Sequence, residues 1–272
     1  MSDKQFSSRK YAIAGAAVLA LGASALGLAY LYPPFGPSAG TIAPVATSRI
    51  DALGGGQIPS RGRYVLVDAA AAKLFMIEDG RVQDSMKVIV GKPASATPAL
   101  RSTIFYATFN PYWNVPTDLA QTIIAPKVVK EGTTYLTDRQ YEVVTGFGAA
   151  AQVLAPESVD WAKVASGEAK VHVRQRPNPA NSMGRVKFNL AYVEQIYLHD
   201  TPKKELFAQE QRNLSNGCVR LEDAPRFARW LLKDASVAPP AAPEQHVPLP
   251  RGVPITIAYL DDKSQMQLAS LQ

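Results

Sequence analysis

Short apolar runs separated by Gly, Pro and Asp dominate the hydrophobic pattern of this chain beyond its first sixty residues. The dipeptide Asp79-Gly80 lies between two of these runs and is typical of a hairpin turn. Helical spacing of apolar side chains is convincing only at residues 222–233. The pattern therefore predicts a mainly β domain with few short helices, and it predicts strands at residues 64–67, 73–77, 81–90, 102–109, 171–176, 185–189, 194–198 and 253–260.

Three stretches depart from this strand pattern. Residues 117–170 mix apolar and polar positions without a steady period, and we expect them to form an inserted cap or lid with short helices. Residues 239–250 are rich in proline and predict a loop before the last strand. Residues 33–60 are dense in Pro, Gly, Ser and Ala, which predicts a linker.

The N-terminal segment carries an export signal. Residues 11–32 are uncharged and apolar, and about 20 such residues span the ~30 Å hydrocarbon core of a membrane. Basic residues just before them predict that residues 1–10 stay in the cytoplasm as a tail. A cleaved signal peptide is the alternative, since Ala23-Ser24-Ala25 fits a small-x-small cleavage site. We favour a transmembrane anchor because the hydrophobicity continues to Leu31.

Composition narrows the class of protein. The 272 residues are 47% hydrophobic and 19% charged, which is typical of a globular domain and not of a disordered chain. The net charge of +6 suits an acidic polymer or a membrane surface, although a solvated basic surface is the simpler interpretation. No Lys/Arg-rich run interleaved with aromatic residues is present, so we expect no nucleic-acid partner.

The single cysteine, Cys218, is the strongest indication of chemistry in the sequence. It cannot form an intramolecular disulfide, and an exported protein rarely keeps an unpaired thiol without a use for it. His199 precedes it by 218 − 199 = 19 positions, ends an apolar run, and could act as its general base. Asp200 could orient the imidazole through its backbone carbonyl or its carboxylate.

The neighbours of Cys218 fit nucleophilic catalysis. Arg220 and the start of the helix at residue 222 could lower the pKa of the thiol. Gly217 permits an unusual backbone φ, so that successive amides could face a developing oxyanion. A small buried hydrophobic cysteine is the alternative. We expect no metal, because one Cys and scattered His supply too few ligands, and no cofactor, because no nucleotide-binding loop is present.

These residues resemble the signature of the L,D-transpeptidase catalytic domain (YkuD-type) family, which is a His followed by Ser/Thr-x-Gly-Cys-x-Arg or Asn. The chain matches it at His199, Ser215, Gly217, Cys218 and Arg220. The resemblance covers about residues 62–260 and is to the larger Gram-negative branch of the family. Segments outside the signature that resemble this branch are residues 110–116, 174–177, 184–188 and 197–221.

The resemblance implies a β-sandwich catalytic domain at residues 61–261, followed by a tail at residues 262–272. It also implies a peptidoglycan L,D-transpeptidase that takes part in cell-wall organisation and cell shape and is a carbapenem target. Cys218 would attack the bond between meso-diaminopimelate and D-alanine of a tetrapeptide stem, with His199 as base and the Asp200 carbonyl orienting it. The acceptor amine would come from another stem (a 3→3 cross-link), a lipoprotein lysine or a free D-amino acid.

Binding roles follow from the same resemblance. Residues implied in holding the oxyanion or the substrate are Ser215, Asn216, Gly217, Arg220 and Tyr197. Further arginines that could meet stem-peptide carboxylates are Arg174, Arg176 and Arg212, for which a plain surface role stands as the alternative. Asn216 departs from the pattern, since many family members have His there, and this puts substrate contacts in doubt. No peptidoglycan-binding module is evident.

Three other functions remain open at this point. A catalytically inactive wall-binding scaffold would keep the fold without the chemistry, and an L,D-carboxypeptidase would use water as acceptor in the same site. A cysteine peptidase of another family fits less well, because the Cys precedes the His in papain-like enzymes. We expect the domain on the periplasmic side of the cytoplasmic membrane, held by residues 11–32 or released after cleavage.

Overall fold

The computed structural model describes residues 58–191, 196–234 and 242–271. The expected transmembrane segment at residues 11–32 and most of the expected linker lie outside these described residues. Within the described ranges, no helix combines the length and the apolar character that crossing a bilayer requires.

Nine strands form the main sheet, in the order β11-β3-β12-β10-β9-β4-β13-β1-β2. They are β1 (Arg63–Asp68), β2 (Lys73–Glu78), β3 (Arg81–Gly91), β4 (Leu100–Phe109), β9 (Val186–Leu190), β10 (Tyr197–His199), β11 (Asn213–Ser215), β12 (Val219–Leu221) and β13 (Gln245–Ala258). Because β2 also pairs with β3, the strand pairing returns on itself. The sandwich implied by the family resemblance is thus built from one sheet that closes, without a separate second layer.

The main core lies on one face of this closed sheet. Alternation along β1 sends Val65 and Val67 into the core, together with residues from β2, β4, β9 and β13. Helix α5 (Ala224–Leu232) covers part of the core, and its Phe227 packs edge-to-face on Phe188 with ring centroids 4.8 Å apart. Asp223 caps the helix by accepting from the Arg226 amide.

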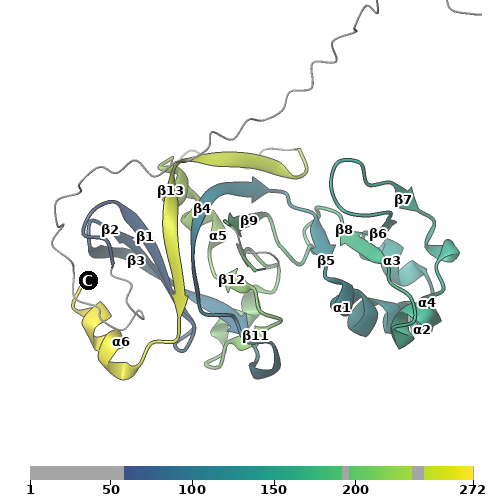
Figure 1. Ribbon diagram of the computed structural model, residues 1–272, viewed down its shortest axis with the longest axis horizontal. Coiled ribbons are helices and arrows are strands. Elements are labelled where there is room, and N and C mark those ends of the chain that lie inside the picture. The colour runs from purple at the N-terminus through teal and green to yellow at the C-terminus, as the bar shows by residue number, and fades with distance from the viewer. Residues whose placement is uncertain (1–57, 192–195, 235–241, 272) are drawn as a thin grey trace, which may run out of the picture. The chain divides into compact units, whose positions relative to one another are not determined.

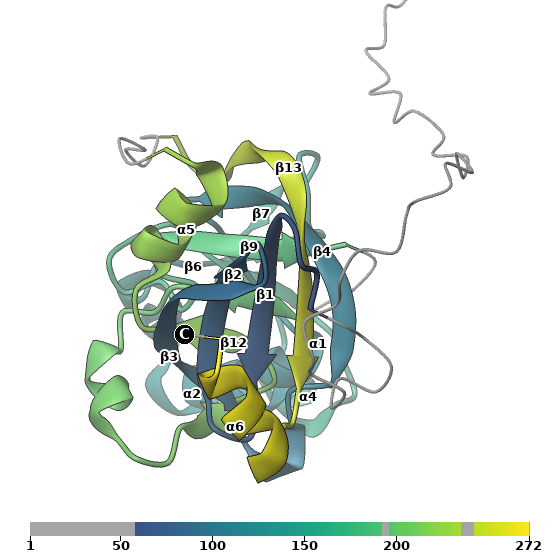
Figure 2. The ribbon, with the colours of Figure 1, turned by 90° about the vertical axis from the view of Figure 1, so that its left-hand side faces the viewer.

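A smaller core covers the other face of β1. Tyr64 and Leu66 point to this side and pack with Leu268 of α6 (Asp262–Ala269), and Figure 2 shows this helix beside the end of β1. Asp261 caps α6 by accepting from the Ser264 amide. The residues assigned to a C-terminal tail therefore contain a capped helix that buries an apolar side chain.

A second, four-stranded sheet is built from residues 113–175, with the order β5-β8-β6-β7. Its strands are β5 (Trp113–Val115), β6 (Tyr141–Val144), β7 (Val153–Leu154) and β8 (His172–Gln175). Helices gather beside them (Figure 1): α1 (Thr117–Leu119), α2 (Ala125–Glu131), α3 (Thr134–Asp138) and α4 (Trp161–Ser166), with a π-helical turn at Ala120–Ile124. These elements share a core of their own, so the insert is a small packed unit and not an extended loop.

The prediction of a loop over residues 239–250 is wrong for its second half, because β13 begins at Gln245. Prolines lack the amide donor that strand pairing uses, and their density in this segment therefore predicted a loop. The strand accommodates them because its pairing with β4 shifts register between Pro248 and Val253. The other predicted strands correspond to observed ones, although residues 171–176 form β8 of the second sheet. Residues 194–195 lie outside the described ranges.

Candidate active site

The catalytic candidates lie at the ends of adjacent strands of the main sheet, His199 as the last residue of β10 and Cys218 just before β12. His199 is the last residue of β10, which runs between β9 and β12. Strand register sets His199 opposite Arg220 of the parallel β12 and opposite Lys187 of the antiparallel β9. Cys218 comes directly before β12, whose first residue, Val219, pairs with Leu198 of β10. The sheet thereby places the predicted base and the predicted nucleophile at neighbouring positions.

The imidazole of His199 is held in one tautomer. Its Nδ1 lies 2.5 Å from the backbone oxygen of Asp200, and because a carbonyl only accepts, Nδ1 carries the proton and donates. The ring is 4% exposed. The pKa of His199 is lowered to about 4, mainly by burial and in smaller part by the nearby Arg220 and Lys187 cations. At neutral pH the ring is therefore uncharged, and its Nε2 lone pair is available as a base.

Asp200 is itself held on two sides. Its Oδ2 accepts from the Arg185 amide at 2.9 Å and its Oδ1 from Lys204 Nζ at 2.7 Å. Gly184 allows the Asp200 side chain to lie in this position, because a Cβ at residue 184 would be 2.5 Å from the Asp200 Cγ. Its φ of +62° is also one that glycine adopts without strain. The carboxylate that we predicted as an alternative contact for His199 is therefore directed to other partners. The backbone carbonyl makes the contact with the ring.

The nucleophile loop (residues 215–218) is fixed by a buried serine. Ser215 Oγ donates to the Cys218 carbonyl at 2.6 Å and accepts from the Gly217 amide at 3.1 Å. Gly217 has a φ of +119°, the unusual conformation that the sequence predicted for it. Thr97 Oγ1 links the loop to β3, because it donates to the Gly217 carbonyl at 2.8 Å and accepts from the Gly91 amide at 2.8 Å. Hydrogen bonds between the Ser215 and Thr97 hydroxyls and the backbone therefore fix the position of the loop that carries Cys218.

Two expectations about this loop need correction. The Gly217 amide, expected to face an oxyanion, donates to Ser215 Oγ, because the loop closes on its own serine. The pKa of the Cys218 thiol is raised, whereas we expected it to be lowered. Burial raises it, and the opposing effects of a hydrogen bond from the Tyr197 backbone and of the Arg220 charge are smaller. The resting thiol thus keeps its proton, which makes a neighbouring base necessary.

Arg220 is a cation that acts on both catalytic candidates, His199 and Cys218. It interacts electrostatically with His199 and with Cys218. It is partly buried, and burial lowers the pKa of its guanidinium. Within the part of the chain that the structure describes, no carboxylate forms an ion pair with it. A desolvated guanidinium without an acidic partner attracts an anion, so Arg220 is suited to bind a carboxylate of a ligand.

The other predicted arginines have structural partners. Arg174 of β8 forms an ion pair with Glu142 at 2.8 Å and stacks on the Tyr112 ring at 4.5 Å. Arg176 is more exposed and lies 3.7 Å from the same carboxylate. Arg212 donates to the backbone carbonyls of several residues at 3.0–3.3 Å. Because their partners are groups of the protein, these contacts favour a role outside substrate binding for all three arginines.

Sequence reasoning missed three residues that support the site, namely Lys187, Lys204 and Thr97. Lys187 interrupts the apolar run of β9, and a charged residue in such a position was a signal that could have been followed. It is nearly buried and forms an ion pair with Glu244 at 2.9 Å. Thr97 and Lys204 lie in connecting segments, where the sequence carries no comparable signal. Asn216 is exposed, at the surface of the nucleophile loop.

Within the described ranges, no group of three or more His, Cys, Asp or Glu side chains could hold a metal ion.

The family model for the L,D-transpeptidase catalytic domain (YkuD) matches residues 62–242. The chain belongs to this family. It is also 34% identical over 178 residues to a Haemophilus influenzae protein named "Putative L,D-transpeptidase". The match covers 65% of this chain and 35% of the relative, so the chain spans about a third of that protein's length.

Solved structures of L,D-transpeptidases are more distant from this chain. One from Mycobacterium smegmatis is 14% identical, with 72% of this chain and 58% of that chain covered and a TM-score of 0.37. The catalytic domain of the Enterococcus faecium enzyme, acylated by ertapenem, is 12% identical, with 73% and 98% covered and a TM-score of 0.33. The family assignment depends on the sequence matches and not on these structural comparisons.

Proposed function

We propose that this L,D-transpeptidase family member is a cysteine acyltransferase that acts on tetrapeptide stems of peptidoglycan. The observation that supports it most directly is the neutral, buried His199, whose Nδ1–H is fixed on the Asp200 carbonyl beside the strand that follows Cys218. A fixed neutral base next to a protonated thiol is the arrangement needed for nucleophilic attack on a carbonyl.

In the first half-reaction, His199 Nε2 takes the thiol proton and Cys218 Sγ attacks the carbonyl carbon between meso-diaminopimelate and D-alanine. The tetrahedral intermediate collapses, the C–N bond breaks, and His199 returns the proton to the leaving amine of D-alanine. A thioester on Cys218 remains. Arg220 would pair with a stem carboxylate, which fits its desolvated guanidinium.

In the second half-reaction, an acceptor amine attacks the thioester carbonyl. His199 takes a proton from the amine, the C–S bond breaks, and the thiol is restored. A diaminopimelate amine gives a 3→3 cross-link, a lipoprotein lysine gives lipoprotein attachment, and a free D-amino acid gives exchange. Water in place of the amine gives an L,D-carboxypeptidase.

The first test is acylation by a carbapenem, followed by intact mass, of the full-length protein in detergent. Wild type should gain the mass of one drug molecule, and Cys218→Ala should gain none. His199→Ala should react much more slowly, while His246→Ala is the matched histidine control, because His246 is exposed on β13. A wild type that stays unmodified would favour the wall-binding alternative.

The second test uses tetrapeptide muropeptides and identifies the products by mass. Release of D-alanine with a cross-linked dimer supports the transpeptidase. Release of D-alanine with only the tripeptide supports the carboxypeptidase. Addition of a free D-amino acid or of a lysine-terminated peptide tests the other two acceptors.

We further propose that residues 11–32 anchor the domain on the periplasmic side of the cytoplasmic membrane, for which the support is the apolar sequence alone. An anchored chain should resist carbonate extraction and keep its full mass. A shorter, soluble product would instead show cleavage near Ala25.

A further inference from the structure

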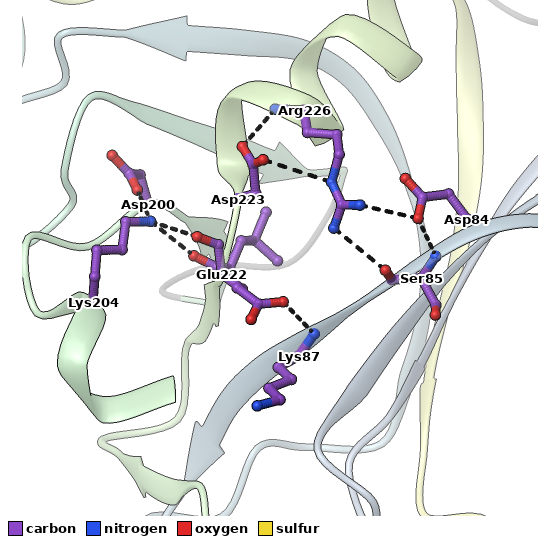
Figure 3. Close-up of polar contacts among 9 residues, drawn as sticks. Asp84, Ser85, Lys87, Asp200, Lys204, Glu222, Asp223 and Arg226 are labelled. Atoms are coloured by element: carbon purple, nitrogen blue, oxygen red, sulfur yellow. Dashed lines mark hydrogen bonds and ion pairs between the residues drawn. The ribbon is translucent and has the colours of Figure 1, made fainter. Parts of the chain in front are cut away.

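The Lys204 ammonium makes three polar contacts next to the candidate site, and Figure 3 shows them. Its Nζ lies 2.7 Å from Asp200 Oδ1, 2.8 Å from the Glu222 carbonyl and 3.3 Å from the Leu221 carbonyl. An ammonium has three protons, so these partners use its full donor capacity. All three partners are groups of the protein, which indicates that the side chain acts on the protein itself.

These contacts join the chain after the base to the chain after the nucleophile. Asp200 follows His199 directly, at the end of β10. Leu221 ends β12, the strand that begins one residue after Cys218. Since β10 and β12 are parallel neighbours, Lys204 fastens their matching ends to each other. The relative position of the two catalytic candidates depends on that connection.

The charge of Lys204 matters as well. The Asp200 carboxylate raises the pKa of His199, whereas the cations that face the ring, Arg220 from β12 and Lys187 from β9, lower it. Lys187 is itself paired with Glu244. Lys204 forms an ion pair with the Asp200 carboxylate at 2.7 Å and offsets its negative charge.

We propose that Lys204 is a positioning residue for the His199 base, which fixes the Asp200 carbonyl under Nδ1 and balances the Asp200 carboxylate. Its effect on the reaction rate rests on the proposed acyltransferase function, but its effect on the imidazole does not. The two can therefore be measured separately.

The first measurement is the titration of the His199 imidazole by NMR in full-length protein labelled at its three histidines. Lys204→Met should move this titration upward by about one pH unit, because the carboxylate beside the ring is no longer balanced. Lys203→Met is the matched control, because it removes the same charge from an exposed neighbour whose side chain has no polar partner in the described structure. Lys204→Arg keeps a cation and should shift the titration less than Lys204→Met.

The second measurement is the rate of carbapenem acylation of the same variants against pH. Lys204→Met should lower the rate about tenfold and move its acidic limb to higher pH. In an Asp200→Asn background the carboxylate is gone, so adding Lys204→Met should move the limb less than it does in the wild-type background. A residue that only stabilises the fold would lower the melting temperature without moving the limb.

The outcomes separate the two proposals. An imidazole titration that is the same in wild type and Lys204→Met, or that moves equally in Lys203→Met, would overturn the role of Lys204. A wild-type protein that no carbapenem acylates would instead overturn the proposed function, and the NMR titration would still decide the role of Lys204.

Discussion

The buried, neutral His199 should make the stability of this domain depend on pH in a way that one substitution removes. In the unfolded chain the imidazole titrates near its ordinary pKa of 6.5, and in the folded chain the pKa is about 4. Between these values the unfolded state binds more protons, so the free energy of unfolding falls as the pH falls. The loss begins near pH 6.5 and is complete below about pH 4.

The magnitude follows from the difference of 2.5 pH units between the two pKa values. At about 1.4 kcal/mol per unit, His199 alone costs about 3 kcal/mol of stability at low pH. His199→Asn removes the titrating group while its side-chain N–H can still reach the Asp200 carbonyl. The pH dependence of the variant should therefore be weaker than that of wild type by this amount.

The assay is urea unfolding of both proteins, followed by tryptophan fluorescence, from about pH 7.5 to about pH 4. Carboxylates also titrate at the low end of this range, but they do so in both proteins and cancel in the difference. Parallel stability profiles would refute the reasoning, because they would mean that the ring is solvated and titrates normally in the folded state.

Three further substitutions test the supports of the site and the core. Gly184→Ala should destabilise the domain by roughly 1–3 kcal/mol in urea unfolding and slow carbapenem acylation, because the added Cβ would strike Asp200; full retention of both would contradict the close packing there. Ser215→Ala should cost about 1–3 kcal/mol and slow acylation, since it removes two hydrogen bonds inside the nucleophile loop, and an unchanged acylation rate would argue against that role. Phe227→Ala should cost about 3–5 kcal/mol by leaving a cavity against Phe188, and a calorimetric melting point close to wild type would disprove this packing.

The strands that the sequence predicted well are those whose apolar runs are long and bounded by turn residues. The first three strands follow this rule, and Asp79, with its positive φ, forms the turn between β2 and β3. β12 contains only three residues, which is too short for a period to emerge. β13 was hidden at its start by prolines such as Pro248, which the strand tolerates at a register shift.

The candidate residues of the site were easier to find in the sequence than the residues that support them. A lone cysteine after a suitably placed histidine is a signal in the residue types themselves, and the sheet register sets the two on neighbouring strands. The partners of Lys204 belong to segments that are distant in sequence, and nothing local distinguishes it from Lys203. The thiol pKa was misjudged because burial, the largest cause, is a property of the folded protein.

The pairing of β1 with β13 has a consequence for how the protein reaches its folded state. Val65 pairs with Ile255, which lies 255 − 65 = 190 positions later in the chain. β13 also pairs with β4. Until β13 has been synthesised, β1 and β4 therefore each keep one edge without a partner strand. Contacts this distant make folding slow and expose strand edges to wrong partners. The main sheet is therefore completed late, after nearly all of its residues have been synthesised.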